Sequence, residues 1–252
     1  MVETATGHSV DLPADWLQGR TAYGGLTASL CVESALRHAP DLPPLRSAQF
    51  ALVGPAGGLV HLSPEVVRRG KSSVVVSVNL DGEAGPAARS LLTFGASRPS
   101  LVDYSAMPAP AVPPPGDCPS FFNPDTAPSF ARHFDVRRAG GQKVYSPDSL
   151  PELLVWIRHG DAAARSGLTG LIALADALPP PVLVLFSKPG PFSTMTWSID
   201  LAVDAPASAS GWWLVHSQAQ AAATGYSTQS MTIWDDQGGF VLAARQTVAI
   251  FV

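Results

Sequence analysis

The chain has 252 residues, of which 46% are apolar and 14% are charged, and its net charge is −4 at pH 7. Globular proteins average about 25% charged residues, so this composition excludes a disordered, self-repelling chain. A negative chain with an isoelectric point near 5.8 also argues against binding to nucleic-acid phosphates. No apolar run approaches the roughly 18 residues of a membrane span, and residues 1–10 lack the basic start and apolar centre of a secretory signal. We therefore expect a cytoplasmic protein without a nucleic-acid or membrane partner.

The pattern of the first half of the chain predicts one helix followed by strands. Residues 24–38 carry apolar side chains mostly on one helical stripe, and Pro40 ends the helix. Strand-like runs follow at 45–53, 60–69, 72–80 and 88–96. Asp81-Gly82 lies between the last two, which is a hairpin signal.

A proline-rich segment divides the chain. Residues 106–128 contain eight prolines, a density that neither a helix nor a central strand tolerates. We interpret it as an extended linker stiffened by polyproline geometry. The predicted domains are therefore residues 1–105 and residues 129–252, joined by the linker 106–128.

The second half repeats the order of the first. Short strands are predicted at 134–136 and 153–157, and a helix at 168–178 that is closed by three prolines. Four further strands are predicted at 195–203, 213–222, 227–234 and 240–251. One helix followed by four strands, occurring twice, is typical of an α+β fold.

Short matches between the halves support a duplication. Residues 47–51 (SAQFA) match residues 198–202 (SIDLA), and residues 87–90 (AARS) match residues 243–246 (AARQ). In this alignment Asp200 stands where the first copy has Gln49, and Gln246 stands where it has Ser90. A duplicated enzyme that kept one active site would show such a difference. We therefore expect a single site that uses Asp200 and Gln246.

Other common chemistries leave no motif in the chain. There is no GxSxG nucleophile elbow, no HExxH, no GxGxxG and no phosphate-binding loop. The two cysteines, Cys31 and Cys118, exclude a disulfide framework and a four-cysteine zinc site. We expect neither a metal nor a cofactor.

Several segments, in this order and spacing, resemble one known family. They are 19–25 (GRTAYGG), 44–47 (PLRS), 65–72 (EVVRRGKS), 121–123 (FFN), 134–137 (FDVR), 198–200 (SID) and 243–246 (AARQ). Together they resemble the type II acyl-CoA thioesterases. The resemblance implies a double hotdog, which is two fused copies of a long helix wrapped by an antiparallel β-sheet. It also implies hydrolysis of an acyl-CoA substrate to coenzyme A and a carboxylic acid.

The resemblance further implies which side chains hold the attacking water. The family uses an Asp, a Gln and a hydroxyl residue. The Asp carries over to Asp200 and the Gln to Gln246. The hydroxyl position falls on Ser217 or Gln218, and here the sequence departs from the family pattern. Homo-oligomers are also expected, because hotdog sheets associate.

The chemistry is reasonable on its own terms. A thioester carbonyl is electrophilic and a thiolate leaves readily, so a carboxylate base that deprotonates water is sufficient. The oxyanion needs donors, and the free N–H groups at a helix start supply them. Gly24 and Gly25 are the first candidates, and the segment 167–170 is the equivalent in the second half. Two alternatives stay open at this point, namely a non-catalytic acyl-CoA or acyl-chain binding protein and an assembly module.

Overall fold

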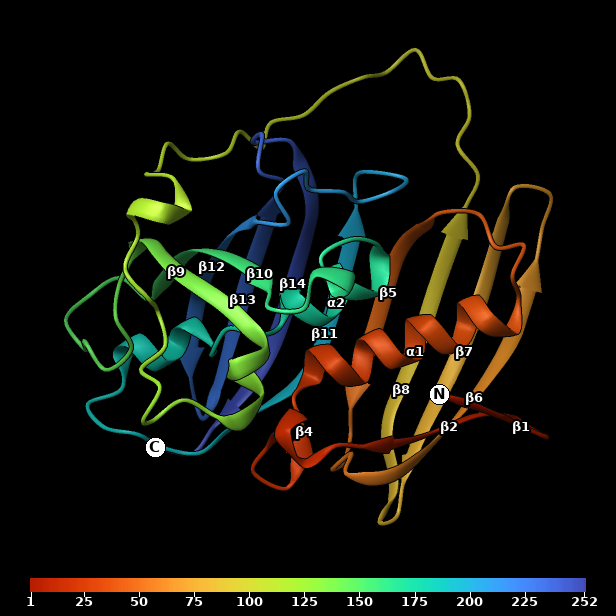
Figure 1. Cartoon of the computed structure of the whole chain (residues 1–252), viewed down its shortest axis with the longest axis horizontal. Coiled ribbons are helices and arrows are strands. Elements are labelled where there is room, and N and C mark those ends of the chain that lie inside the picture. The colour runs from red at the N-terminus through yellow and green to blue at the C-terminus, as the bar shows by residue number, and fades with distance from the viewer.

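The computed structural model describes all 252 residues and contains an antiparallel sheet of twelve strands with both helices on the same face (Figure 1). The first half supplies β1 (Val2–Thr4), β2 (Gly7–Leu12), β5 (Leu45–Leu52), β6 (Gly58–Arg69), β7 (Ser73–Gly82) and β8 (Gly85–Gly95). The second half supplies β9 (Phe134–Gly141), β10 (Glu152–His159), β11 (Phe192–Leu201), β12 (Trp213–Ala223), β13 (Tyr226–Trp234) and β14 (Phe240–Ile250). The helices are α1 (Gly24–His38) and α2 (Leu168–Ala175).

Shorter elements complete the chain. A separate two-stranded ribbon is formed by β3 (Leu17–Gln18) and β4 (Thr21–Ala22). The 3₁₀ turns are η1 (Ala14–Trp16), η2 (Pro115–Asp117), η3 (Ser129–His133), η4 (Ala162–Ala164) and η5 (Pro181–Leu185).

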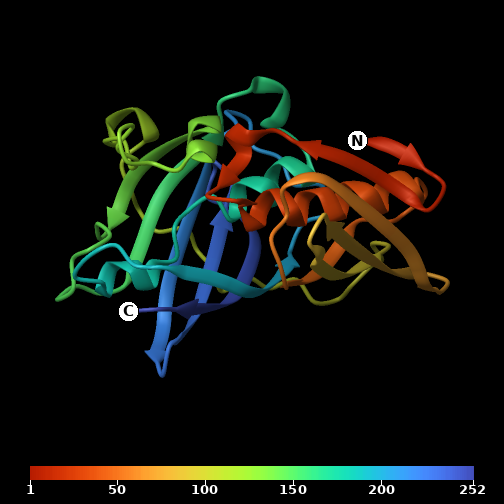
Figure 2. The same cartoon turned by 90° about the horizontal axis from the view of Figure 1, so that it is seen from below.

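The strand order is symmetric about the middle of the sheet. It runs β1-β2-β6-β7-β8-β5-β11-β14-β13-β12-β10-β9, so each strand of the first half has a counterpart at the same distance from the centre. The two halves meet where β5 pairs with β11. This arrangement confirms the predicted α+β double hotdog, and Figure 2 shows from below how the sheet bends around the helices.

The sequence explains why α1 can lie so close to the sheet. Its buried face carries small side chains, Ala28, Cys31, Val32 and Ala35, at helical spacing. The opposing strands alternate, as in β7, where every second residue from Val74 to Leu80 is buried. One core of 44 residues runs through both halves, because Phe50 on β5 and Trp197 on β11 lie with ring centroids 5.8 Å apart.

Two differences from the predicted elements have physical reasons. The strands β1 and β2 were not predicted, because their sequences are short, polar and rich in weak strand formers. The second helix is shorter than predicted and ends at Ala175 instead of residue 178, ahead of Pro179, Pro180 and Pro181.

Part of the proline-rich segment packs as a strap on the outer face of the second half. The indole N–H groups of Trp156 and Trp234 donate to Pro113 O at 2.9 Å and to Met107 O at 2.8 Å. These tryptophans form a small separate cluster with Cys118, Trp212 and Leu214. Residues 96–114 otherwise contain neither helix nor strand, as expected from their prolines.

Candidate functional site

Asp200 and Gln246 lie on opposite faces of the sheet. Trp197 pairs directly with Gln246 in the β11–β14 ladder, and both side chains are buried on the core face. Asp200 is three positions further along β11, so its side chain points to the other face, where it is exposed. The expectation that Asp200 and Gln246 share a cleft is therefore wrong.

The ladder also corrects the alignment of the two copies at this strand. A single row of core-facing residues crosses the sheet from β7 to β13, in the order Val78, Ser90, Phe50, Trp197, Gln246 and Gln229. Phe50 is thus the counterpart of Trp197. Counting three positions further along each strand makes Val53, and not Gln49, the counterpart of Asp200. The predicted alignment, in which Gln246 corresponds to Ser90, agrees with this row of residues.

The carboxylate beside Gln246 is Asp176, which sequence reasoning missed. It follows the last residue of α2, and Gln246 Nε2 donates to Asp176 Oδ1 at 2.5 Å. A signal was present, because Asp176 is the one charged residue in the otherwise apolar stretch 171–178 (LIALADAL). An ionisable side chain in a buried segment is rare unless it has a function or a partner.

The start of α1 packs directly against this carboxylate. A Cβ atom added to Gly24 would lie 2.5 Å from Asp176 Oδ2, and one added to Gly25 would lie 2.5 Å from Ala173 O. The backbone N–H of Gly25 is close enough to the Asp176 carboxylate to favour its ionised form. The glycines therefore permit the first turn of a helix, where N–H groups are free, to meet an acid. The structure brings Gly24, Gly25 and Gln246 together around Asp176.

Burial changes the protonation of this acid. Loss of solvation raises the pKa of Asp176 to about 7, although the hydrogen bonds from Gln246 and Gly25 favour the ionised form. The neighbouring phenol of Tyr23 has its pKa raised well above the usual value, first by burial and then by the charge of Asp176. Tyr23 donates instead to Ala173 O at 3.0 Å. A carboxyl group that titrates near neutrality is suited to accept a proton from water.

A second glutamine continues the polar contacts behind Gln246. Gln229 Nε2 donates to Gln246 Oε1 at 3.5 Å, and Gln229 Oε1 accepts from the Val182 N–H at 3.2 Å. The amides thus form a chain that ends on Asp176. Sequence reasoning did not select Gln229.

Ser217 and Gln218 are not part of this chain. Ser217 is buried on the core face of β12 and donates to Ser230 O at 3.4 Å, whereas Gln218 is on the other face. Strand β13 separates β12 from β14, and no hydrogen bond joins either residue to Asp176 or Gln246. The segment 167–170 starts α2 and packs against the middle of α1, where Ser29 donates to Thr169 O at 2.8 Å.

Asp176 opens into a cleft of about 1630 Å³ between the two halves. It is the only acid among the lining residues, which include three cations, Arg20, Arg138 and Lys143. Aromatic and apolar side chains supply much of the remaining wall: Phe121, Phe122, Phe130, Tyr145, Leu178 and Phe192. The cleft therefore combines one acid, a set of cations and an apolar surface.

The polar site exists in one copy only. In the row across the sheet, the counterparts of Gln246 and Gln229 are Ser90 and Val78. On the first side, the α1 side chain beside Ser90 is Cys31, which is fully buried and therefore takes the place that Asp176 has beside Gln246. One of the two symmetry-related positions thus has a carboxylate and the other has a buried cysteine.

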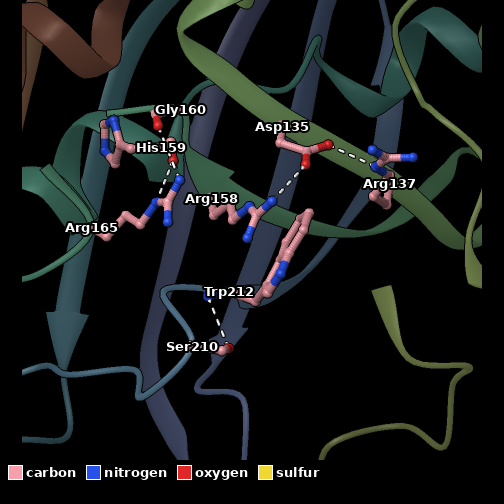
Figure 3. Close-up of polar contacts among 8 residues, drawn as sticks. All are labelled: Asp135, Arg137, Arg158, His159, Gly160, Arg165, Ser210 and Trp212. Carbon is pink, nitrogen blue, oxygen red and sulfur yellow. Dashed lines mark hydrogen bonds and ion pairs between the residues drawn. The ribbon is translucent and has the colours of Figure 1, made fainter. Parts of the chain in front are cut away.

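A separate polar network lies at β9 and β10 (Figure 3). Asp135 accepts from Arg137 at 2.7 Å and from Arg158 at 3.2 Å, and the Arg158 guanidinium lies 4.3 Å from the centre of the Trp212 ring. Arg165 binds the carbonyls of His159 and Gly160. Because the Asp135 carboxylate and the Arg137, Arg158 and Arg165 guanidinium groups all have partners within the network, we assign it to the stability of the sheet edge.

No group of three or more His, Cys, Asp or Glu side chains is arranged to hold a metal ion. Neither helix has the length and apolarity that crossing a membrane requires.

Comparison with solved structures supports the fold. A conserved protein of unknown function with a hot dog fold from Alicyclobacillus acidocaldarius has a TM-score of 0.86 and 21% identity, covering 97% of this chain and 92% of the other. An acyl-CoA thioesterase II, TesB2, from Mycobacterium marinum has a TM-score of 0.70 and 19% identity, covering 90% and 88%. The dehydratase domain of RzxB from Pseudomonas fluorescens also matches, with a TM-score of 0.54 and 14% identity over 98% and 95%. The fold alone therefore does not decide the reaction.

Comparison with protein families is more specific. A search of curated proteins finds no match. The family model for the acyl-CoA thioesterase N-terminal domain matches residues 12–95, and the model for the acyl-CoA thioesterase C-terminal domain matches residues 111–250. Since the two models together cover most of the sequence, the chain belongs to the acyl-CoA thioesterase family and is a thioester hydrolase.

Proposed function

We propose that Asp176 is the general base that activates water for hydrolysis of an acyl-CoA thioester, with Gln246 and the first turn of α1 as its partners. The observation that carries this proposal is the single carboxylate of the cleft, which lies against Gly24 and Gly25 and has a pKa of about 7. The proposal replaces Asp200 with Asp176 as the base and keeps Gln246. Ser217 and Gln218 have no part in it.

The proposed reaction has two steps. An ionised Asp176 takes a proton from a water molecule, and the resulting hydroxide forms a bond to the carbonyl carbon of the thioester. The tetrahedral intermediate then breaks its carbon–sulfur bond and expels the coenzyme A thiolate, which receives the proton from Asp176, and the carboxylic acid remains. No cofactor is needed, because the carbonyl is already electrophilic and the thiolate is a good leaving group.

The neighbours of Asp176 have distinct roles in this scheme. Gln246 donates to Oδ1, so Oδ2, which faces Gly24, is the oxygen available to the water. The N–H groups at the start of α1 that have no helical acceptor can donate to the developing oxyanion. The Gly25 N–H is directed at Asp176, which leaves the Gly24 N–H as the candidate donor to the oxyanion at the start of α1.

The rest of the cleft fits the two ends of the substrate. Arg20, Arg138 and Lys143 offer positive charge to the phosphates of coenzyme A. The aromatic wall at Phe121 and Phe122 offers an apolar surface to the acyl group. The cytoplasmic location and homo-oligomeric assembly stay predictions.

A pair of isosteric variants tests the assignment of the base. We expect Asp176→Asn to lower kcat by at least about 10²-fold in an assay that detects released coenzyme A with a thiol-reactive dye, because the base is removed. Asp200→Asn, the matched control on the exposed face of β11, should retain activity. In the parent enzyme, kcat/KM should fall on the acid side of about pH 7 as Asp176 is protonated.

Two results would count against the proposal. Full activity in Asp176→Asn would exclude Asp176 as the base. If the parent protein is stabilised by acyl-CoA but releases no coenzyme A, a binding function is favoured instead.

A further inference from the structure

Gln229 occupies an unusual position for a polar side chain. It lies on the core face of β13, is 1% exposed, and has Val78 as its counterpart in the first half of the sheet. Burying an amide is unfavourable unless its hydrogen-bonding groups have partners. The fold itself does not require an amide here, because the first copy is built with valine.

The contacts of Gln229 determine how its amide is turned. The Val182 N–H donates to Gln229 Oε1 at 3.2 Å, so the NH₂ group faces the other way, toward Gln246 Oε1 at 3.5 Å. With its oxygen directed at Gln229, Gln246 presents its own NH₂ group to Asp176. A backbone N–H that cannot rotate therefore sets the direction of both amides.

We propose that Gln229 is a positioning residue, which holds the Gln246 amide with its NH₂ group toward Asp176 and thereby keeps the Asp176 carboxylate ionised. The inference rests on the proposed function, because Asp176 has to lose its proton before it can act as a base. Gln229 does not line the cleft, so it acts through Gln246 and not on the substrate.

The physical reason lies in what a reversed Gln246 would do. Turned by half a rotation, it would place Oε1 beside Asp176 Oδ1, where Nε2 now lies at 2.5 Å. Two acceptors at that separation repel each other unless the acid is protonated and donates. The donor on Gln229 disfavours this arrangement, and without it Asp176 would hold its proton to higher pH.

The other groups around Asp176 do not replace this control. α1 presents Gly24 and Gly25, and the titratable side chain that faces Asp176 is Tyr23, whose phenol donates to Ala173 O. β14 presents Gln246, and the turn η5 contributes the Val182 N–H, which binds Gln229.

A purely structural role for Gln229 is the competing explanation, since its oxygen also satisfies the Val182 N–H. The two roles differ in what they do to Asp176. A structural role predicts a lower melting temperature with no change in the Asp176 pKa, whereas a positioning role predicts a higher pKa that depends on Gln246.

The experiment measures the Asp176 carboxyl pKa by ¹³C NMR in the substrate-free protein, with Asp176→Asn to identify the signal. Gln229→Met, which has no amide, should raise this pKa by about one pH unit, a tenfold change in the ionisation constant. The matched control is Ser227→Ala, two residues earlier on the same buried face of β13, whose hydroxyl has no partner. It should leave the pKa unchanged.

A double-mutant cycle separates action through Gln246 from general loosening of the core. In a Gln246→Met background, Gln229→Met should cause no further change in the Asp176 pKa. An unchanged pKa in Gln229→Met, or an equal rise with and without Gln246, would overturn the proposal. Should Gln229→Met not fold, Gln229→Asn, which withdraws the amide by one methylene, is expected to raise the pKa in the same way.

These readouts also distinguish this inference from the proposed function. In the active enzyme, the acid side of the kcat/KM profile should move up in pH together with the pKa. If the parent protein hydrolyses no thioester, the proposed function fails, while the pKa comparison still decides the role of Gln229.

Discussion

Replacing Asp176 with asparagine should change how the stability of the protein depends on pH. The substitution keeps the shape of the side chain and removes its charge and its proton equilibrium. In the folded protein the pKa of Asp176 is raised from 3.8 to about 7, chiefly by loss of solvation. The folded state therefore binds this proton more tightly than the unfolded state does.

The sign and size of the effect follow from that difference. A carboxyl group with a raised pKa contributes stability that is fully present below pH 3.8 and is lost as the pH rises through about 7. Each pH unit between those values corresponds to about 1.4 kcal/mol, so the whole change is about 4 kcal/mol. Asp176→Asn lacks this dependence. The free energy of unfolding of the variant minus that of the parent should therefore increase by about 4 kcal/mol between about pH 4 and about pH 8.

The assay is urea unfolding followed by circular dichroism at a series of pH values. Any constant effect of the amide cancels, because only the change of the difference with pH is interpreted. Asp200→Asn removes one charge from the exposed face of β11 and corrects for the change in net charge. Parallel stability curves for the parent and Asp176→Asn would refute the reasoning, since they would mean that Asp176 is as well solvated in the folded protein as in the unfolded chain.

Two further substitutions test the packing around the site and the strap. Gly25→Ala places a Cβ atom 2.5 Å from Ala173 O, so it should destabilise the protein by roughly 1–3 kcal/mol and lower kcat. The control, Gly116→Ala, adds a Cβ atom in open space and should change neither stability nor kcat. Trp234→Phe removes the donor to Met107 O, so it should cost about 1 kcal/mol in urea unfolding and speed proteolytic cleavage within residues 99–106. Unchanged stability in Gly25→Ala, or unchanged cleavage in Trp234→Phe, would contradict these two assignments.

The loss of one of two equivalent sites is consistent with the geometry of the duplicated fold. The row across the sheet has the same positions on both sides of the β5–β11 contact, yet polar amides occupy only the second side. Cys31 and Val78 take the places of Asp176 and Gln229 in the first half and join its apolar core. A second buried carboxylate would carry the same cost of desolvation, and the cleft has only one acid.

Much of the fold could be predicted from local patterns in the sequence. Alternating apolar residues predicted the long strands of both halves, and Asp81-Gly82 predicted a hairpin that is present in the β7–β8 pair. Segments that match between the two halves predicted the duplication. The order of a further set of segments along the chain predicted the family, which the two family models confirm. These signals are local in the chain, because the periods of strands and helices are set by backbone geometry.

The site depended on relations that the sequence does not display. Asp200 seemed suitable because it lies in a matched segment, but the parity of β11 turns it to the exposed face when Trp197 faces Gln246. Asp176 lies 70 positions from Gln246 and meets it only when the end of α2, the start of α1 and β14 converge. The sequence by itself determined both helices, the long strands, their repetition and the family, but not the short strands β1 and β2. Only the tertiary structure decided which acid lies, partly buried, beside the glutamine, since contact across elements and loss of solvent arise from packing.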